Sequence, residues 1–369
     1  MKHIIVSEDL LPNIMLVTNA IHKTPTGGRE LLCKLNYNIL KDLYNDRCIV
    51  FELSKNYIIG IKSIINAFRG YIDGLSPESV ALALQQIQAQ NVDKIFVDGS
   101  NLGKFVKVVK TKFPEIQIYT FFHNVEARFF WGAFKQNPSP HSLAVLATNY
   151  LAERKSIAYA DNIICLNNRD SALLKKLYGR LSDYITPMSI QDKYTDRAVT
   201  TRPKTKFALF VGGDFYANFS GIKWFVKNVA PYITIQIFIV GRGMKNFRKE
   251  LEISNNVKVI GEVDSLEKWY LESYFVIAPI FDGSGMKTKI AEALMFGKKI
   301  IGTPEAFSGY EEISAEAGHV CTNADDFIDA INSADKMVDC LFDRKLREIY
   351  KSKYSFSAAK DRLKRILNA

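Results

Sequence analysis

The most constraining feature of this 369-residue chain is an alternation of short apolar runs with longer amphipathic stretches, which continues from one end to the other. The runs have the length of buried strands, and the stretches between them place apolar residues at helical spacing. The runs include NIMLVTNAI, CIVFEL, KIFVDG, IQIYTFF, FALFVGG, IQIFIVGRG, VKVIG, YFVIAPI, KKIIGT and HVCT. Strands that alternate with helices in this way form parallel sheets covered by helices on both faces. The sequence therefore predicts an α/β fold.

The alternation is interrupted once, by a polar segment without a period. Residues 186–205 read TPMSIQDKYTDRAVTTRPKT and contain two prolines. The chain is also too long for one ordinary core. We expect an N-terminal Rossmann-like domain over 1–187, a linker over 188–205, a second Rossmann-like domain over 206–338, and C-terminal helices over 339–369 that could pack back on the first domain. Two doubly wound domains would face a cleft, and ligands of such sheets bind beyond the carboxyl ends of the strands.

Charge and composition narrow the class of protein. The net charge of +10 favours anionic partners, which include phosphorylated small molecules, acidic lipids and nucleic acids. We do not expect a nucleic-acid partner, since no zinc finger or RNP-like motif is present. The five cysteines are scattered without a CxxC pair, which is typical of buried thiols in a reducing compartment. No apolar run reaches about 18 residues and the N-terminus is a poor signal peptide, so we expect a cytoplasmic protein without a transmembrane helix.

One glycine-rich segment carries the clearest chemical signal. Residues 279–303 read PIFDGSGMKTKIAEALMFGKKIIGT. A strand is expected to end near Ile280, and Gly283 and Gly285 permit a sharp turn after it. A helix should then begin near Met286 or Lys287, and its first amides have no partners within the helix. Together with the helix dipole, these amides predict an anion site that suits phosphate.

Side chains of the same segment extend this site. Ser284 could donate a hydroxyl, and Lys287 or Lys289 could add a positive charge. Glu292 shares a helical face with Lys289 and could accept hydrogen bonds from ribose hydroxyls. A simpler alternative is that Lys289 and Glu292 form only a surface ion pair.

The same segment resembles the donor-site signature of GT-B glycosyltransferases, in particular the large retaining family often called family 4, or glycosyl transferases group 1. Further segments resemble other parts of that family, and together they span nearly the whole chain: TPTGGREL, FFHNVEARFF, YADNIICLNNRDSALLKKLYG, FVGGDFYANFSGIKWFVKNVAP, FIVGRGMKN and VKVIGEVDSLEKWYLESYFVIAP. The resemblance implies the GT-B fold and transfer of a sugar from a nucleoside-diphosphate donor.

The resemblance also implies roles for individual residues. His123 matches the family's histidine beside the transferred sugar and is the catalytic candidate, and Glu292 matches the ribose ligand. Backbone positions that line the donor are implied at Gly27, Gly28, Gly241, Gly243 and Val263. The loop before the helix adds Asp282, Gly283, Ser284, Gly285 and Met286 to the expected donor site.

The chain departs from the family at two places. Ser284 stands where the first acid of the family's E-x7-E motif is expected, and Asp282 lies close by but out of register. The family's basic residues after the first strand of the second domain are expected near Gly213 and Ser220, and neither is basic. We infer that the missing positive charge comes from one of three residues: Arg242, Lys287 or Lys289.

The expected mechanism needs no metal and no protein nucleophile. The sequence contains no Asp-x-Asp pair, so amides and lysines must meet the charge of the leaving diphosphate. The family's retaining outcome is usually explained by same-face attack, in which the leaving phosphate helps to deprotonate the acceptor. His123 is expected at the carboxyl end of a strand. Glu126 either orients His123 or lies favourably in the first turn of the next helix.

Partners follow from the resemblance and from one further segment. We expect a nucleotide-sugar donor and a glycan or polyprenyl-diphosphate-linked acceptor, in bacterial surface polysaccharide synthesis. Residues 126–156 are aromatic and basic, and they either line an acceptor site, rest on the inner face of the plasma membrane or fill a core. Two other functions stay open at this point: a non-catalytic GT-B scaffold that binds a glycan or a partner glycosyltransferase, and a nucleotide-sugar epimerase.

Overall fold

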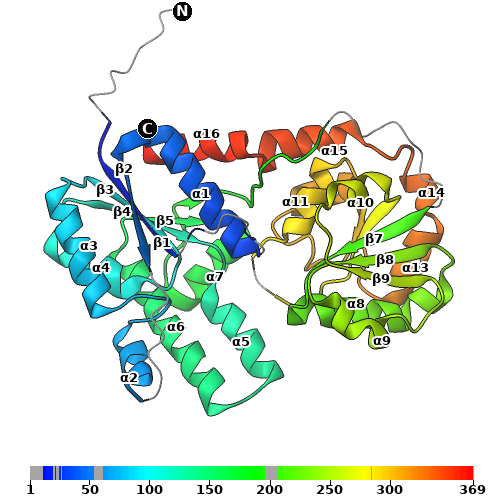
Figure 1. Ribbon diagram of the computed structural model, residues 1–369, viewed down its shortest axis with the longest axis horizontal. Helices are drawn as coiled ribbons and strands as arrows, with labels where there is room; N and C mark the ends of the chain where they lie inside the picture. Colours follow the sequence, from blue (N-terminus) through cyan, green and yellow to red (C-terminus); the bar gives the residue numbers. More distant parts are fainter. Residues whose placement is uncertain are drawn as a thin grey trace, which may run out of the picture. The chain divides into compact units, whose positions relative to one another are not determined.

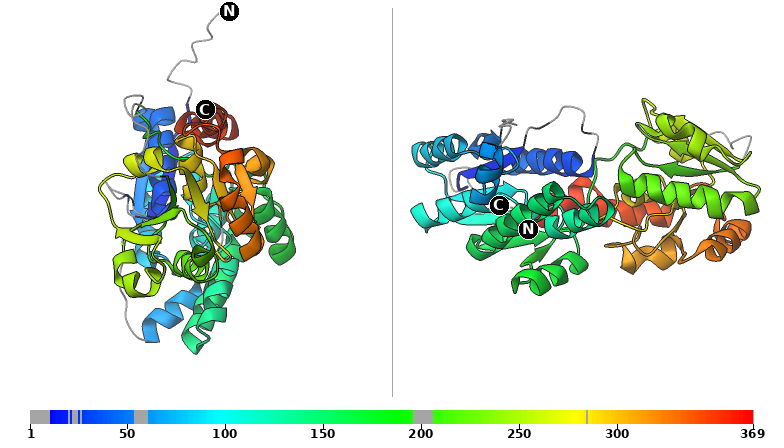
Figure 2. Two further views of the ribbon diagram at one scale, coloured as in Figure 1. Left: turned by 90° about the vertical axis from the view of Figure 1, so that its right-hand side faces the viewer. Right: turned by 90° about the horizontal axis from the view of Figure 1, so that it is seen from below.

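A computed structural model describes residues 11–19, 21, 25, 27–53, 61–195, 206–283 and 285–368 (Figure 1). The chain divides into two units. The first consists of Met1–Pro187 together with Ala359–Ala369, and the second consists of Met188–Ala358. Each unit contains one six-stranded sheet in which all neighbouring strands are parallel. Helices cover both faces of each sheet (Figure 2).

The sheet of the first unit has the strand order β2-β1-β3-β4-β5-β6. Its strands are β1 (Ile14–Asn19), β2 (Cys48–Leu53), β3 (Lys94–Asp98), β4 (Gln117–Phe122), β5 (Asn162–Cys165) and β6 (Tyr184–Ile185). Its helices are α1 (Gly28–Tyr44), α2 (Ile61–Arg69), α3 (Pro77–Ala89), α4 (Gly103–Lys112), α5 (Glu126–Gln136), α6 (Pro140–Tyr159) and α7 (Asn168–Tyr178). The ends of three helices follow from local chemistry, because Ser76 and Ser139 form capping boxes for α3 and α6, and Asn167 caps α7.

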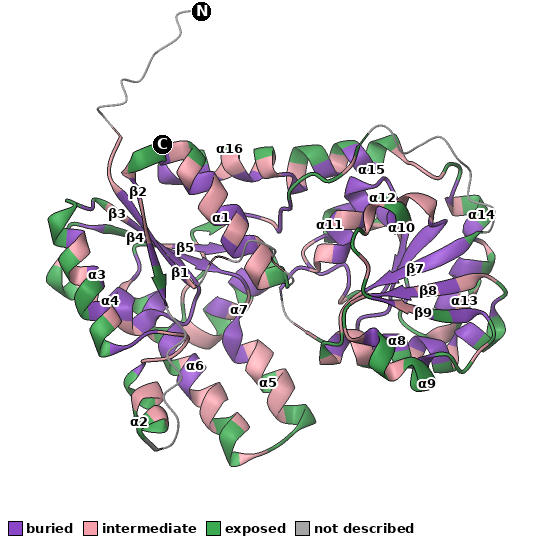
Figure 3. Ribbon diagram, viewed as in Figure 1, coloured by how far each residue is buried: buried purple, intermediate pink, exposed green. Residues whose placement is uncertain are grey.

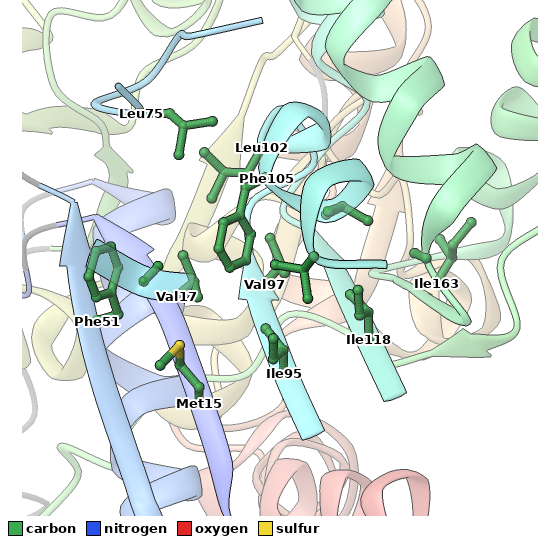
Figure 4. Close-up of a cluster of buried hydrophobic side chains, with 14 of the residues drawn as sticks. Met15, Val17, Phe51, Leu75, Ile95, Val97, Leu102, Phe105, Ile118 and Ile163 are labelled. Atoms are coloured by element: carbon green, nitrogen blue, oxygen red, sulfur yellow. The ribbon is translucent and has the colours of Figure 1, made fainter. Parts of the chain in front are cut away.

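Alternate residues of the first sheet pack against different helices, as the two-residue period of a strand requires. Met15 and Val17 of β1 belong to a core cluster with Phe105 of α4 and residues of α3 and α6 (Figure 4). The strands are buried along most of their length (Figure 3). Because both faces of the sheet are covered, the strands appear in the sequence as continuous apolar runs.

The sheet of the second unit has the strand order β12-β11-β10-β7-β8-β9. Its strands are β7 (Phe207–Val211), β8 (Gln236–Val240), β9 (Val257–Gly261), β10 (Phe275–Ala278), β11 (Ile300–Gly302) and β12 (Gly318–Val320). Its helices are α8 (Tyr216–Asn228), α9 (Arg248–Leu251), α10 (Glu267–Glu272), α11 (Thr288–Met295), α12 (Ser314–Ala317), α13 (Ala324–Asn332), α14 (Ala334–Met337) and α15 (Arg344–Ile349). The α/β fold with two doubly wound sheets, predicted from the alternation, is confirmed.

Each sheet has one point where the order of strands reverses. In the first sheet β1 leads to β2 on one side and β3 lies on the other, so the reversal falls between β1 and β3. In the second sheet the reversal falls between β7 and β10. The connections that leave such a pair of strands run in opposite directions and leave room for a ligand at the carboxyl edge. Both reversal points are therefore the places to search for a site.

The ends of the second unit differ in detail from the expected linker and C-terminal helices. Of the segment 188–205, the described part packs on the second unit: the amide of Met188 lies 3.2 Å from Met286 Sδ, and Ile190 pairs with Ser355. Residues 196–205 lie outside the described residues. A single helix, α16 (Phe356–Leu367), leads from the second unit into the first, where Leu363 and Leu367 are buried.

All five cysteines are free; Cys33, Cys48, Cys165 and Cys321 are buried as expected, whereas Cys340 is exposed. The expectation of a buried thiol is thus wrong for Cys340, which lies in the irregular segment between α14 and α15. Among the described residues, no helix has both the length and the apolar content needed to span a membrane.

Gly221 should be essential for the packing of α8 beside β10. A Cβ atom at this position would lie 1.8 Å from the carbonyl oxygen of Pro279, so Gly221→Ala forces the backbones apart. We expect the substitution to lower the free energy of unfolding by about 2 kcal/mol, the usual cost of overpacking, in a urea titration. The neighbouring exposed residue provides the control, and Ser220→Ala should change stability little. Equal stability of the two variants would contradict this packing.

Candidate functional site

The loops after β7 and β8 pack closely against each other at the reversal point of the second sheet. The amide of Gly212 donates to Val240 O at 2.9 Å, and the amide of Asp214 donates to Arg242 O at 3.0 Å. A Cβ atom at Gly241 would lie 1.9 Å from Gly212 O. The two loops therefore present mainly backbone at the carboxyl edge of the sheet.

Gly243 is required for a second reason. Its φ is +78°, in the left-handed region, and a Cβ atom there would lie 2.1 Å from Asp214 Oδ2. The structure thus brings the predicted residues Gly241 and Gly243 against the loop that follows β7. Arg242 between them is exposed, and Val263 is half-buried two residues beyond the end of β9.

Two helices start at this edge without a side-chain cap. Phe215 precedes α8 and Lys287 precedes α11, and neither side chain accepts a hydrogen bond from the helix. By contrast, Asn323 caps α13 and Asp343 caps α15 through their side chains. No cap side chain accepts a hydrogen bond from the first amides of α8 and α11, and the dipoles of both helices favour negative charge there.

The glycine loop before α11 has the conformation that its sequence predicts. Gly283 has a φ of +123° and Gly285 a φ of +67°, both in the region that favours glycine. Asp282 is exposed, and Ser284 lies outside the described residues. Met286 is buried and its side chain packs against Gly309, so only its backbone can face a ligand.

Of the three cations proposed for the site, Lys287 is already neutralised. Its Nζ lies 2.9 Å from a carboxylate oxygen of Glu305 and donates to Gly285 O at 3.0 Å. These contacts hold the ammonium against its own loop. Lys287 therefore acts chiefly in the structure of the loop.

Lys289 is different, because it is buried without a carboxylate bonded to it. The residue is 8% exposed, its Nζ donates to Asn218 Oδ1 at 2.9 Å, and the ammonium lies 4.4 Å from the ring centroid of Phe210. Burial lowers the pKa of Lys289 to about 7, although the nearby Glu292 opposes this shift. Lys289 comes from α11, whereas Phe210 and Asn218 come from β7 and α8, so its ammonium joins the two sides of the reversal point.

A second buried lysine shows what a fully satisfied ammonium looks like in this fold. Lys298 is 1% exposed and donates to three carbonyl oxygens, those of Leu271, Ser273 and Leu341, at 2.9, 2.8 and 2.6 Å. An ammonium has three donors, so Lys298 has none to spare. Among the described residues Lys289 has a single hydrogen-bond acceptor, which leaves it able to bind an anion.

Glu292 is held in place by a buried tyrosine. The hydroxyl of Tyr270 donates to Glu292 Oε2 at 2.8 Å, and the ring of Tyr270 stacks on Phe296 with centroids 5.1 Å apart. Burial raises the pKa of Glu292, while Tyr270 and Lys289 oppose the shift. Lys289 and Glu292 each bond to another partner, so the simple surface ion pair considered from the sequence is wrong.

In the first unit, His123 lies at the carboxyl edge of the sheet, directly after β4. It is 6% exposed, and its Nε2 lies 2.9 Å from Asp98 Oδ1. Asp98 ends β3 and is fully buried; it also accepts hydrogen bonds from Thr18 Oγ1 at 2.9 Å and Asn36 Nδ2 at 2.8 Å. Burial alone would raise the pKa of Asp98, but His123 and the hydrogen bonds lower it to about 2.

Cys33, Asp98 and His123 place one potential metal ligand each within 4.8 Å of one another. Two observations favour a hydrogen-bonded cluster instead of a metal site. The carboxylate of Asp98 already accepts three hydrogen bonds, and burial raises the pKa of the Cys33 thiol far above its usual range, whereas a metal ligand must be a thiolate.

The bond to Asp98 determines what His123 offers to a ligand. Because Nε2 donates to the carboxylate, Nδ1 is the nitrogen that remains, and it is buried without a hydrogen-bond partner among the described residues. An unsatisfied buried nitrogen costs free energy unless a ligand or water completes it. The imidazole is thus oriented by Asp98 and presents one open nitrogen.

Acidic residues close to His123 have structural partners. Glu126 begins α5, and burial raises its pKa to about 8, an effect that Arg29 opposes. The acid that caps α5 is Glu153, which accepts from the amides of Glu126 at 2.8 Å and Ala127 at 3.0 Å. Glu126 therefore does lie in the first turn, but Glu153 supplies the favourable negative charge at the helix start.

Gly27 and Gly28 lie at the start of α1 and are exposed. Gly27 has a φ of −123°, and a Cβ atom at this position would meet no atom within 4 Å. Nothing within the described residues thus requires a glycine there. Arg29, the second residue of α1, pairs with Asp73 of the segment that joins α2 to α3.

Sequence reasoning missed three residues that shape these sites: Asp98, Asn218 and Tyr270. Asp98 could have been found, because a carboxylate at the end of the buried run KIFV is unusual unless it has partners. Asn218 and Tyr270 carry no such signal, since their partners lie 71 and 22 residues away in the sequence.

The lowered pKa of Asp98 makes a prediction about acid stability. The folded pKa of about 2 lies below the ordinary value of 3.8, so the stabilisation is complete above about pH 4 and is lost as the pH falls towards 2. Over this range the free energy of unfolding of the wild type should fall by about 2 kcal/mol relative to that of Asp98→Asn. Urea unfolding at each pH measures this difference. Asp46→Asn, an exposed acid of the same unit, should keep the wild-type pH dependence. Parallel curves for wild type and Asp98→Asn would show that Asp98 is not held ionised.

Comparisons with known proteins give a family match for part of the chain and a fold for the whole. Residues 205–334 match the family described as glycosyl transferases group 1. Sucrose-phosphate synthase from Thermosynechococcus elongatus is similar in structure, with a TM-score of 0.74 and 14% identity over 96% of this chain and 98% of that chain. No match is found among curated protein sequences.

Two further solved structures have the same fold over nearly their whole length. Anabaena HepE in complex with UDP has a TM-score of 0.67 and 13% identity, over 96% of this chain and 99% of that chain. WaaG, a glycosyltransferase involved in lipopolysaccharide biosynthesis, has a TM-score of 0.66 and 12% identity, over 96% of this chain and 99% of that chain. With the family match over residues 205–334, these likenesses lead to one conclusion: the chain has the fold of the GT-B glycosyltransferases, and its second unit matches the glycosyl transferases group 1.

Proposed function

We propose that the chain is a retaining, metal-independent glycosyltransferase that binds a nucleoside-diphosphate sugar at the reversal point of the second sheet. The observation that carries this proposal is Lys289, a buried ammonium with donors to spare beside two uncapped helix starts. A diphosphate there would receive backbone amides and a cation in a site of low polarity, where such interactions are strong.

The remaining parts of the donor have matching groups. Glu292 is fixed by Tyr270 through Oε2, which leaves Oε1 for a ribose hydroxyl. The backbone at Gly241 and at Gly243 approaches the loop after β7 closely, so main-chain atoms form this part of the wall. UDP is the first nucleotide to test, because HepE has been solved with UDP and with UDP-glucose.

The proposed chemistry uses the leaving group as the base. The bond between the anomeric carbon and the diphosphate oxygen breaks, and the acceptor oxygen bonds to the same face of that carbon. The proton of the acceptor hydroxyl passes to the departing phosphate oxygen. Lys289 and the amides of α8 and α11 stabilise the charge that develops on the diphosphate, which is the role a metal has in other transferases. His123 offers Nδ1 to a sugar hydroxyl.

We propose a glycan or lipid-linked acceptor and a role in surface polysaccharide synthesis at the cytoplasmic face of the membrane. The support is likeness to WaaG, which is described as involved in lipopolysaccharide biosynthesis. Exposed apolar side chains on the first unit, among them Trp131 of α5 and Leu143 of α6, fit a contact with a membrane surface or an amphiphilic acceptor.

A panel of nucleotide sugars tests the donor site. We expect one of UDP-, GDP- or dTDP-sugars to raise the melting temperature, because a ligand stabilises the state that it binds. Glu292→Ala should lose most of this shift, since the ribose then lacks its acceptor. His123→Ala, in the other unit, should keep the shift and chiefly lower turnover. A full shift in Glu292→Ala would contradict the assignment of the ribose ligand.

The lowered pKa of Lys289 predicts that donor binding takes up a proton. A diphosphate raises the pKa of a neighbouring ammonium, so a site that is half-protonated near pH 7 becomes fully protonated on binding. Affinity should therefore fall as the pH rises above 7. Titration calorimetry with UDP-glucose at pH 8, in two buffers of different ionisation enthalpy, should show an uptake of close to one proton.

The control exploits the constant charge of arginine. A nucleotide sugar has no phosphate ionisation near neutral pH, so the proton must go to the protein. Lys289→Arg should bind without proton uptake, because a guanidinium stays charged throughout this range. Lys289→Met should weaken binding about tenfold or more. Proton uptake that persists in Lys289→Arg would assign it to another group, such as Glu292.

A further inference from the structure

The polar segment that the sequence presents as a linker lies in part beside the candidate ribose site. Its described part, residues 188–195, follows directly on Pro187 and belongs to the second unit. The segment contacts three helices there: α10, α11 and α15. Two of these helices carry Tyr270 and Glu292, which are bonded to each other. Segment 188–195 is therefore placed to act on that pair.

Hydrogen bonds fix segment 188–195 at the ends of α10 and α11. The amide and the hydroxyl of Thr195 donate to Glu267 Oε1 at 3.1 and 2.7 Å, and Glu267 begins α10, three residues before Tyr270. The amide of Lys193 lies 3.3 Å from the sulfur of Met295, the last residue of α11. The segment thus joins the two helices in one arrangement.

Between these contacts the ring of Tyr194 is held on two sides. Arg347 of α15 donates to both carboxylate oxygens of Asp192, at 2.9 and 2.5 Å, and its guanidinium carbon lies 4.8 Å from the ring centroid of Tyr194. Arg347 is buried, which strengthens its attraction to the ring. The ring of Tyr194 also stacks on Phe342, with centroids 5.0 Å apart. The fold therefore sets the position of this ring.

A series of ring contacts leads from Tyr194 to Glu292. The rings of Tyr194 and Phe296 meet at 68° with centroids 6.4 Å apart, and Phe296 stacks on Tyr270 with centroids 5.1 Å apart. Both distances lie in the range of favourable aromatic pairs. Tyr270 then donates to Glu292 Oε2 at 2.8 Å. Phe296 is 2% exposed, so removal of the ring of Tyr194 would leave a gap into which Phe296 and Tyr270 can move.

Glu292 depends on this support. It is half-buried, and within the described residues Tyr270 is the group that bonds to its carboxyl, without a salt bridge to a lysine or an arginine. Burial raises the pKa of Glu292, and the hydrogen bond from Tyr270 and the ammonium of Lys193 oppose the shift. Segment 188–195 thus acts on Glu292 through charge as well. A carboxylate that must meet a ribose hydroxyl gains from a fixed direction, because a small misplacement weakens such a contact.

We propose that Tyr194 is a positioning residue of the donor site, which acts through Phe296 and Tyr270 to fix the direction in which Glu292 presents Oε1 to the ribose. The inference rests on the proposed function, because Glu292 meets a ribose only if the second unit binds a nucleotide donor. It adds to the site a residue that lies far from segment 279–303 in the sequence.

Titration calorimetry on the full chain with UDP and with inorganic pyrophosphate tests the proposal. UDP presents a ribose to Glu292, whereas pyrophosphate presents only the anion that Lys289 and the two helix starts would hold. We expect Tyr194→Ala to weaken UDP binding about fivefold, which corresponds to the loss of one aromatic contact, and to leave pyrophosphate binding unchanged. GDP or dTDP takes the place of UDP if the wild type binds it more tightly.

Two control variants and one double variant identify the cause. Tyr194→Phe keeps the ring and should bind UDP like the wild type. Tyr232→Ala makes the same truncation at a residue that is 67% exposed and lies beyond the end of α8, and it should also bind UDP normally. On a Glu292→Ala background, Tyr194→Ala should weaken UDP binding no further, because the group that it positions is gone.

The outcomes separate this inference from the proposed function. Unchanged UDP affinity in Tyr194→Ala would overturn the inference alone, since the wild type would still bind the nucleotide. Equal weakening of UDP and pyrophosphate, or a further loss on the Glu292→Ala background, would overturn it and assign Tyr194 to the general stability of the second unit. A wild type that binds none of the three nucleotides would overturn the proposed function, and this inference with it.

Discussion

Removal of charged groups from water is the constraint that organises both candidate sites. A buried ion is costly unless hydrogen bonds or an opposite charge replace its hydration. Lys298 meets this demand with three carbonyl oxygens, and Asp98 meets it with Thr18, Asn36 and His123. Lys289 does not, since one amide oxygen and one aromatic ring are its described partners. The difference separates a lysine whose donors are all used within the fold from one that has donors left for the proposed ligand.

Glycines make the incomplete site around Lys289 possible. Close approach of Gly241 to Gly212, and of Gly221 to Pro279, brings three loops together with little side chain between them. The helix starts of α8 and α11 then lie at the same edge as the ammonium. The stability cost of a poorly solvated lysine is thus concentrated at the position where binding would remove it, as is common at functional sites.

Local patterns in the sequence predicted the fold and the strand, turn and helix of the candidate site. The run YFVIAPI, the glycine turn and the helix after it were predictable because strand, turn and helix signals act over a few residues. That Glu292 and Lys289 share one helix also follows from spacing alone. The choice of Lys289 over Lys287 does not, because it depends on Glu305 and Asn218, which neighbour these lysines only after folding. The packing of residues 188–195 on the second unit was missed for the same reason: a polar segment without a period says nothing about its tertiary contacts.

The course of α16 has a consequence for how the protein is made. The second unit is one continuous stretch of chain, whereas the first is completed by residues 359–369, which follow the second unit in the sequence. Leu363 and Leu367 are buried in the first unit, and the hydroxyl of Tyr44 lies 3.5 Å from Leu367 O. Domains usually mature in the order in which they leave the ribosome. Here the N-terminal half emerges first, but its core is completed only once α16 has been synthesised, so the half that emerges second is the first able to reach its final form.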